Sequence, residues 1–183
     1  MSTSNGDMKT KQVRLMTASS ADVKGLYYHS FPKEERLPYV LLTLGAYRHK
    51  VDFDAYYDKD AFCGFSYTYM SQDYVYVLFL AVNDKYQGQG YGTQILESLK
   101  AKAGDRALVL TIEPLDESAA NYQQRLKRLA FYERNGFKAT PYTYHEKKER
   151  YTVLSTRPIK DKKALEKVFK DAVAHLIPTK ITK

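Results

Sequence analysis

The sequence predicts a single α/β (α+β) domain in which helices flank a mixed sheet of about six to seven strands. Residues 52–57, 61–70 and 74–82 read as three successive strands, which is typical of an antiparallel meander. Strand and helix patterns then alternate along the chain. Residues 75–82 are almost wholly apolar, as expected for a central strand that is covered on both faces.

The elements before the meander are short. The polar residues 1–10 are expected to be a flexible N-terminus, and alternation over residues 12–16 predicts a first strand. Ser19 or Ser20 can cap a helix that runs toward Phe31, where Pro32 ends it. A second short helix is expected after Pro38.

A glycine-rich turn follows the meander and leads into further helices and strands. Ile95, Leu96, Leu99 and Ala103 recur at helical spacing, and a strand is predicted over residues 107–112. Tyr122, Leu126, Leu129 and Ala130 trace one face of a helix that Asn135 and Gly136 end. Extended stretches are expected from Phe137 and over residues 152–156, before a lysine-rich amphipathic helix at residues 161–177.

Composition is that of a globular chain. With 183 residues, 44% hydrophobic and 27% charged, residues 1–183 are expected to form one domain. No long apolar run or signal segment is present, so we expect no membrane association. Cys63 is the only cysteine and lies in an apolar stretch, which favours a buried thiol and a cytoplasmic protein. The four histidines have no metal-ligand spacing, so no metal is expected.

The formal charge of +8 favours an anionic partner. Much of the excess lies in the C-terminal lysines, where a solvated helix face is the favoured interpretation. We therefore do not expect nucleic-acid binding, although an RNA- or ribosome-associated protein stays as an alternative.

The most informative segment runs from Gln87 to Thr93, between a buried strand and a helix. Its three glycines allow a tight turn, and the following helix offers unpaired N–H groups that suit a pyrophosphate. Thr93 stands where a dinucleotide fingerprint needs a third glycine, and the lysine of a Walker loop is missing. A plain strand-to-helix turn is the structural alternative.

The spacing Gln-x-x-Gly-x-Gly at Gln87, Gly90 and Gly92 resembles the signature loop of the GNAT superfamily. The strand that ends at residues 80–82, the helix that ends with the sequence of residues 131–137, and the strand between them occur in that family's order. The resemblance implies a GNAT-type three-layer fold with a centrally splayed sheet. It also implies transfer of an acetyl group from acetyl-CoA, as cosubstrate, to a primary amine by direct attack in a ternary complex.

The resemblance also implies where acetyl-CoA binds. Backbone groups of Leu80, Ala81 and Val82 would pair with the pantetheine arm like an added strand. The backbone amides of one continuous loop would surround the pyrophosphate; the loop consists of Gln87, Gly88, Gln89, Gly90, Tyr91, Gly92 and Thr93. Arg125 stands where family members often carry an asparagine that contacts CoA.

Two residues are predicted to be catalytic. Tyr132 matches the family tyrosine that protonates the departing thiolate, although a core aromatic is the alternative. Residues 74–82 contain no acid, so Glu113 is the leading candidate for the base, with a surface carboxylate as the alternative. Glu34 and Glu35 are interpreted as solvated.

The acceptor is not identified by the sequence. Aromatic residues of segment 27–39, together with Tyr67, Tyr69, Tyr142 and Tyr144, would line a pocket for an amine or else form an aromatic core. A noncatalytic CoA-binding module is the alternative function. A monomer and a homodimer both fit the sequence.

Overall fold

The computed structural model describes residues 8–183, so most of the N-terminal segment predicted to be flexible lies outside the described residues. The chain divides into two compact units. The first contains Met1–Thr68 and Phe79–Ser98, and the second contains Tyr69–Leu78 and Leu99–Lys183. Strands β3 (Ala61–Met70) and β4 (Tyr74–Val82) and helix α3 (Tyr91–Ala103) each contribute residues to both units. Each unit is therefore described by itself.

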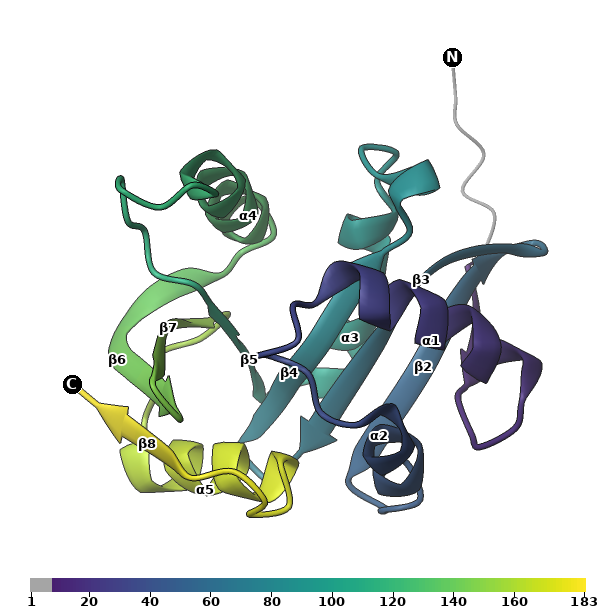
Figure 1. Cartoon of the computed structure of the whole chain (residues 1–183). Coiled ribbons are helices and arrows are strands. Elements are labelled where there is room, and N and C mark those ends of the chain that lie inside the picture. The colour runs from purple at the N-terminus through teal and green to yellow at the C-terminus, as the bar shows by residue number, and fades with distance from the viewer. Residues whose placement is uncertain (1–7) are drawn as a thin grey trace. The chain divides into compact units, whose positions relative to one another are not determined.

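The elements follow one another as a mixed series of strands and helices (Figure 1). In chain order they are β1 Lys9–Gln12, α1 Ala18–Ser30, α2 Tyr39–Gly45, β2 Val51–Asp58, β3 Ala61–Met70, β4 Tyr74–Val82, the short 3₁₀ turn η1 Asp84–Tyr86, α3 Tyr91–Ala103, β5 Ala107–Ile112, α4 Tyr122–Arg134, β6 Lys138–Glu146, β7 Glu149–Ser155, α5 Lys162–Ala172 and β8 Thr179–Thr182.

The strands form a mixed sheet, which confirms the predicted fold class. Their order is β1-β2-β3-β4-β5-β7-β6-β8, so the described residues contribute eight strands rather than six to seven. Strands β4 and β5 are parallel, and their pairing joins Tyr74–Val77 to Ala107–Leu110. Strand β4 continues to Val82, so its carboxyl half extends beyond that paired segment.

Unit 1 has helices on both faces of its strands. Successive residues of β3 point to opposite faces, so the contacts of two neighbouring residues show which helix covers each face. A Cβ atom at Gly64 would collide with the carbonyl oxygen of Ala81 and approach Ile95 of α3. The next residue, Phe65, instead contacts the ring of Tyr27 on α1, with the ring centroids 6.2 Å apart. In Figure 1, α1 accordingly lies in front of β3 and α3 lies behind it.

Helix α1 begins one residue or more before the predicted cap. Thr17 is the N-cap residue, and its hydroxyl accepts a hydrogen bond from the backbone N–H of Ser20 at 3.3 Å. Ser19 and Ser20 lie inside the helix and are buried. The helix ends at Ser30, before Pro32 as expected.

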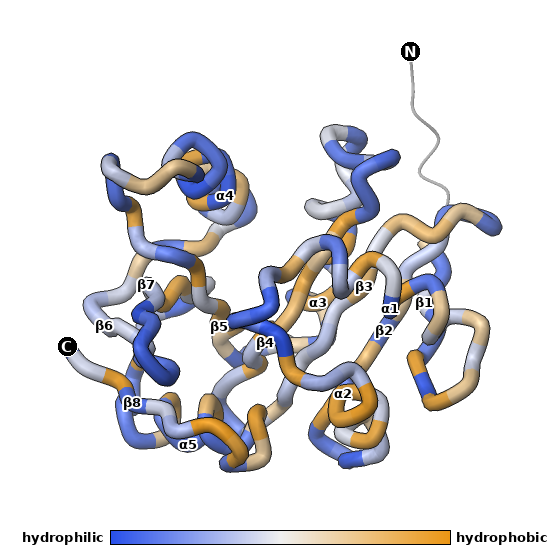
Figure 2. The backbone as a smooth tube through the Cα atoms, in the orientation of Figure 1, coloured by the Kyte–Doolittle hydropathy of each residue, from blue (hydrophilic) through white to orange (hydrophobic). Residues whose placement is uncertain are grey.

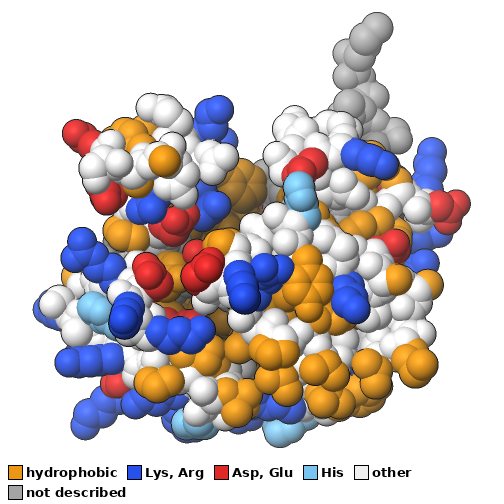
Figure 3. All heavy atoms as spheres, viewed as in Figure 1, with side chains coloured by type: hydrophobic (Ala, Val, Ile, Leu, Met, Phe, Trp, Pro, Cys, Tyr) orange, Lys and Arg blue, Asp and Glu red, His pale blue; other side chains and the backbone are white. Residues whose placement is uncertain are grey.

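Helix α2 presents an apolar outer face. It is orange over most of its length in the hydropathy tube of Figure 2, and Figure 3 shows hydrophobic side chains gathered at the surface over it. Val40, Leu41 and Leu44 are exposed on this helix, as is Tyr47 just beyond it. The guanidinium of Arg14 lies 5.3 Å from the centre of the Tyr47 ring, so a cation covers part of this face.

Unit 2 packs α5 against its strands. Asp161 caps α5 by accepting hydrogen bonds from the N–H groups of Lys163 and Ala164 at 2.8 and 3.2 Å. The buried face of α5 includes Phe169, whose ring contacts Tyr76 at 4.3 Å and Tyr144 at 4.6 Å. The lysines of α5 lie on the outer face, and Lys167 and Lys170 form ion pairs with Asp171 and Glu166 of the same helix.

Two predicted boundaries are wrong. The first strand is Lys9–Gln12, which pairs with β2, whereas residues 13–16 lead into α1. The C-terminal helix ends at Ala172 rather than at residue 177, because Ala174 and His175 both adopt positive φ angles that break the helix. The chain then forms β8, which pairs antiparallel with β6.

No helix in residues 8–183 combines the length and the apolar character needed to cross a bilayer.

Candidate functional site

The carboxyl end of β4 leads into the predicted loop through a hydrogen-bonded turn. The Asn83 amide donates to the carbonyl oxygen of Phe62 at 3.1 Å, and its oxygen accepts from the N–H of Lys85 at 3.2 Å. Gln87 then donates from Nε2 to Oδ1 of Asp84 at 2.6 Å. These contacts fix the direction in which the chain leaves the sheet before the glycines begin.

Gly88 and Gly90 supply the backbone geometry of the loop. Their φ angles are +75° and +88°, a left-handed region that side chains with a Cβ rarely adopt. No heavy atom lies within 4 Å of a Cβ built at either glycine, so the space beside the turn is open. The N–H of Gln94 donates to the carbonyl oxygen of Gly90 at 3.1 Å, which makes Gly90 the N-cap residue that precedes α3.

The first turn of α3 carries donors that suit an anion. Tyr91, Gly92 and Thr93 are the first residues of α3 after Gly90, so their N–H groups have no intrahelical acceptor. The helix dipole adds a partial positive charge at the same end. Together with the open space at Gly88 and Gly90, this arrangement can accommodate a pyrophosphate.

The Tyr91 side chain attaches α3 to the turn between β2 and β3. Its hydroxyl donates to Oδ2 of Asp58 at 2.7 Å, and this hydrogen bond to a carboxylate, together with desolvation, raises the pKa of the Tyr91 phenol to about 12. From the sequence, only the backbone amide of Tyr91 was predicted to have a role, as a contact to the pyrophosphate. Its side chain also holds the start of α3 in place.

Tyr132 lies at the end of α4, where the backbone explains part of the motif. The N–H of Phe137 bonds to the carbonyl of Tyr132, and the N–H of Gly136 bonds to that of Glu133, both at 3.0 Å. With Gly136 at φ +83°, this pair of bonds forms a Schellman cap. The residues after Tyr132 therefore end the helix and fix the position of its last turn.

The Tyr132 hydroxyl is available for chemistry. The residue is half-buried, its ring packs 5.5 Å from that of Phe137, and its hydroxyl has no hydrogen-bond partner within residues 8–183. Burial raises the pKa of the Tyr132 phenol to about 12. The phenol thus keeps its proton at neutral pH and can donate it.

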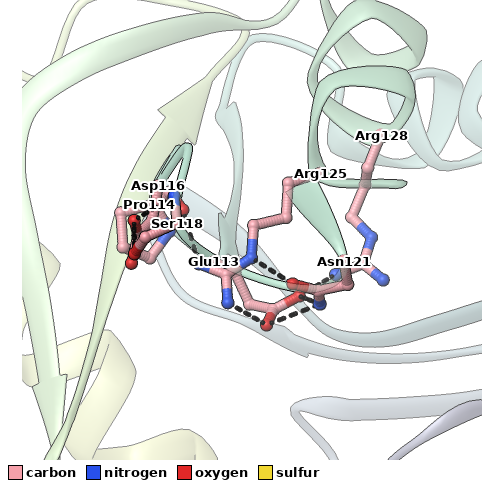
Figure 4. Close-up of polar contacts among 7 residues, drawn as sticks. All are labelled: Glu113, Pro114, Asp116, Ser118, Asn121, Arg125 and Arg128. Atoms are coloured by element: carbon pink, nitrogen blue, oxygen red, sulfur yellow. Dashed lines mark hydrogen bonds and ion pairs between the residues drawn. The ribbon is translucent and has the colours of Figure 1, made fainter. Parts of the chain in front are cut away.

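Glu113 lies at the end of β5 in a network of donors from α4 (Figure 4). Arg125 and Arg128 each approach one carboxylate oxygen at 3.1 Å, and the Asn121 amide contacts both oxygens at 3.2 and 3.3 Å. The Glu113 and Arg125 side chains are 22% and 17% exposed, so this pair is largely shielded from water. Protonating Glu113 would weaken its contacts with all three partner residues, which opposes its use as a base.

Arg125 also forms hydrogen bonds with residues other than Glu113. It donates to the carbonyl oxygen of Pro114 at 2.7 Å and to the Asn121 side-chain oxygen at 2.8 Å. The segment between β5 and α4 is thereby fixed to the first turns of α4. Sequence analysis missed Asn121 and Arg128 as partners of Glu113, although their spacing from Arg125 places all three on one helix face.

The aromatic residues predicted to line an acceptor pocket are mostly core residues. Tyr27, Tyr39 and Tyr67 are buried in unit 1, and Tyr69 and Tyr144 are buried in unit 2. Desolvation raises the pKa of Tyr67 to about 12. The aromatic-core alternative therefore describes these five residues, while Tyr142 is half-buried.

Cys63 is fully buried in β3, which confirms the predicted buried thiol, and desolvation raises its pKa. No group of three or more His, Cys, Asp or Glu side chains in residues 8–183 has the geometry to hold a metal ion.

Comparison with known proteins identifies the class of this domain. Residues 52–139 match the family model described as an acetyltransferase (GNAT) domain. This match and the likeness to solved GNAT-family structures confirm the resemblance predicted from Gln87, Gly90 and Gly92. No curated protein sequence matches the chain.

Solved structures share the fold at low sequence identity. A protein from Bacteroides thetaiotaomicron described as a GNAT-family acetyltransferase has a TM-score of 0.71 at 22% identity, over 89% of this chain and 94% of that one. The Escherichia coli ribosomal-protein-S18-alanine N-acetyltransferase has a TM-score of 0.59 at 19% identity, covering 84% and 97%. A GNAT acetyltransferase from Elizabethkingia anophelis, solved with acetyl-CoA bound, has a TM-score of 0.58 at 16% identity, covering 82% and 98%.

Proposed function

We propose that this protein transfers an acetyl group from acetyl-CoA to a primary amine. The observation that carries the proposal is the left-handed turn at Gly88 and Gly90. It lies between the apolar strand β4, from which η1 separates it, and the start of α3, inside the segment that matches the GNAT model. The amides of Gln87–Thr93 would bind the pyrophosphate, since the turn has open space at Gly88 and Gly90 and the first turn of α3 offers N–H groups without an intrahelical acceptor, although the N–H groups of Gln87 and Gln89 also donate to the carbonyls of Asp84 and Tyr86 at 3.4 Å. The backbone of Leu80, Ala81 and Val82 would pair with the pantetheine arm.

The reaction needs a neutral amine and a protonated leaving group. An alkylammonium with a pKa near ~10.4 is neutral in only about one molecule in a thousand at neutral pH. After proton loss, the amine nitrogen attacks the thioester carbonyl, a C–N bond forms, the C–S bond breaks, and the nitrogen loses its second proton as the amide forms. In this proposal Tyr132 donates its phenolic proton to the departing thiolate, a role supported by its protonated and unpartnered hydroxyl.

The reaction also needs a group that accepts the proton of the ammonium. Glu113 stays the predicted base, yet its carboxylate already accepts from Asn121, Arg125 and Arg128. A base role for Glu113 requires that the Glu113→Gln variant lose the acidic limb of the pH–rate profile. An unchanged profile would leave Glu113 as the residue that holds the segment between β5 and α4.

A turnover assay tests the proposal directly. Purified protein is mixed with acetyl-CoA and a panel of primary amines, and release of the free CoA thiol is followed. The proposal expects thiol release that depends on both the amine and the protein. Saturable acetyl-CoA binding with no release for any amine would instead support a noncatalytic CoA-binding module.

A further inference from the structure

A groove of about 320 Å³ lies in unit 1 between one face of α1 and the carboxyl end of β4. Its α1 wall follows helical spacing, since the lining residues stand at intervals of three, one and three. The opposite wall comes from β3 and from the residues after β4. The lining consists of Asp22, Gly25, Leu26, His29, Phe62, Asn83 and Asp84.

The lining suits a cation with an apolar stem. Among the described residues that form the groove, two are carboxylates and none is lysine or arginine, although the chain carries a formal charge of +8. Asp22 also accepts a hydrogen bond from the hydroxyl of Tyr57 at 2.8 Å, which fixes its carboxylate. Leu26 and Phe62 provide apolar surface beside the charges. A primary ammonium on a short aliphatic chain matches this combination.

His29 and Asp84 form a pair across the groove. Nε2 of His29 lies 2.6 Å from Oδ2 of Asp84, and because a carboxylate only accepts, Nε2 carries the hydrogen. When the ring carries no second proton, Nδ1 has the lone pair that can accept one. The other oxygen of Asp84 accepts from Gln87, so the pair is fixed to the first residue of the glycine loop.

We propose that this groove binds the acceptor amine and that Nδ1 of His29 takes its proton, an inference that rests on the proposed function. Asn83 and Asp84 directly follow Leu80, Ala81 and Val82, the residues proposed to hold the pantetheine arm. The residues that line the groove and the residues that end β4 all belong to unit 1. The acceptor and the thioester would thus share one end of one strand.

The proton balance is simple. The ammonium gives one proton to Nδ1 of His29, and the neutral amine forms the C–N bond as the C–S bond breaks. The nitrogen then loses a second proton as the amide forms, and this proton returns through water to the Tyr132 phenolate that protonation of the thiolate leaves. The thiolate is protonated as in the proposed function. His29 then releases its proton to water, and the Nε2 hydrogen bond to Asp84 stabilises the imidazolium in the interval. An imidazole can exchange a proton near neutral pH, whereas Glu113 is already held by two arginines.

Filling the groove tests the binding part. Gly25 lies inside α1 and lines the groove, and no neighbouring atom lies within 4 Å of a Cβ built there, so Gly25→Leu is expected to place an apolar side chain in the groove. Leucine also has a higher helix propensity than glycine, so the fold is expected to persist. With butylamine as the probe, we expect at least a tenfold loss in kcat/KM for the amine and an unchanged Kd for acetyl-CoA by calorimetry.

Removing the imidazole tests the catalytic part. We expect His29→Ala to lower kcat with butylamine by on the order of 100-fold. Because His29 is 67% exposed, imidazole added to the buffer can reach its place and should restore turnover. His49→Ala is the matched control, since His49 is an exposed histidine of unit 1 outside the groove and its removal should leave turnover unchanged.

The outcomes separate the two proposals. If wild-type protein binds acetyl-CoA and acetylates butylamine, yet Gly25→Leu and His29→Ala keep wild-type rates, this inference is overturned and the proposed function stands. A loss in His29→Ala that imidazole does not restore overturns the base role alone. Failure of wild-type protein to bind acetyl-CoA overturns the proposed function and the acceptor site with it, and binding without turnover of butylamine overturns the ligand class assigned to the groove.

Discussion

The Tyr132 side chain is half-buried, and its hydroxyl has no hydrogen-bond partner within residues 8–183. Burial raises the pKa of the phenol to about 12, so the protonated form persists through neutral and mildly alkaline pH. A general acid is lost only as the pH rises through its own pKa. The rate of the wild-type protein should therefore not fall between about pH 7 and 10 through ionisation of Tyr132.

Replacing Tyr132 by phenylalanine tests the acid role. The ring packing against Phe137 is kept, but the proton donor is lost, so kcat should fall by on the order of 100-fold. The Kd for acetyl-CoA, measured by calorimetry, should change little. An unchanged kcat would show that the thiolate takes its proton from another source.

The Glu113 network gives a stability prediction with an internal control. Arg125→Met removes contacts to Glu113, Asn121 and Pro114 from a shielded site, so the free energy of unfolding should fall by about 2–4 kcal/mol. Arg128 is 44% exposed and contacts only Glu113 among the described residues of this network, so Arg128→Met should cost less than about 1 kcal/mol. Urea denaturation measures the free energy of unfolding of both variants. Equal losses in the two variants would contradict the larger role given to Arg125.

The sequence predicted residues that belong to a local motif, but it did not predict contacts between residues far apart in the chain. Tyr132 could be named because its motif is local, and the same motif proves to be a helix cap that ends at Gly136. The partners of Glu113 could not be named, because an ion pair between the end of a strand and the next helix depends on how the intervening segment folds. The proximity of His29 to Asp84, 55 positions apart, has no local signal at all.

At the scale of elements, the turn between β4 and α3 carries the binding proposal. Gly90 adopts φ +88°, so Gly90→Ala introduces strain of roughly 1–2 kcal/mol or forces the turn to change. Either result should weaken acetyl-CoA binding, by about tenfold for 1.4 kcal/mol. Calorimetric titration of the variant with acetyl-CoA measures the effect.

Gly104→Ala is the control for backbone strain. Gly104 also has a positive φ of +60° and nothing near its Cβ position, but it follows the far end of α3. The substitution should lower stability by a similar amount and leave the Kd for acetyl-CoA unchanged. If both variants weaken binding equally, the effect comes from general destabilisation rather than from the loop.

Elements with strong periodicity were predicted with correct bounds, and marginal ones were not. The bounds of β3, β4 and β5 agree with the sequence prediction, since their apolar runs end at clear turns. Strand β1 is exposed along its whole length and has no apolar pattern to reveal it. Strand β8 was missed because the apolar spacing of α5 continues past the two left-handed residues that end the helix.

At the scale of the whole molecule, the two units are not consecutive along the chain. Strands β3 and β4 and helix α3 each supply residues to both, so neither unit has a continuous sequence of its own. We therefore propose, as the sequence predicted, that the 183 residues form one domain. Melting either unit would require breaking elements that the other also uses.

Thermal unfolding tests this organisation. One cooperative transition is expected, with the calorimetric enthalpy equal to the van't Hoff enthalpy. Circular dichroism and tyrosine fluorescence should report the same midpoint. Two separate transitions would contradict a single domain and indicate that the units unfold independently.

The central claim is that the backbone amides after β4 bind the diphosphate of acetyl-CoA. Titration of ¹⁵N-labelled protein with acetyl-CoA, followed by NMR, tests it most directly, because each amide of the loop gives its own signal. We predict saturable one-to-one binding in which the amides of Gly88, Gly90 and Thr93 shift most strongly. Saturation without any change at those amides, or no saturation at all, would contradict the account.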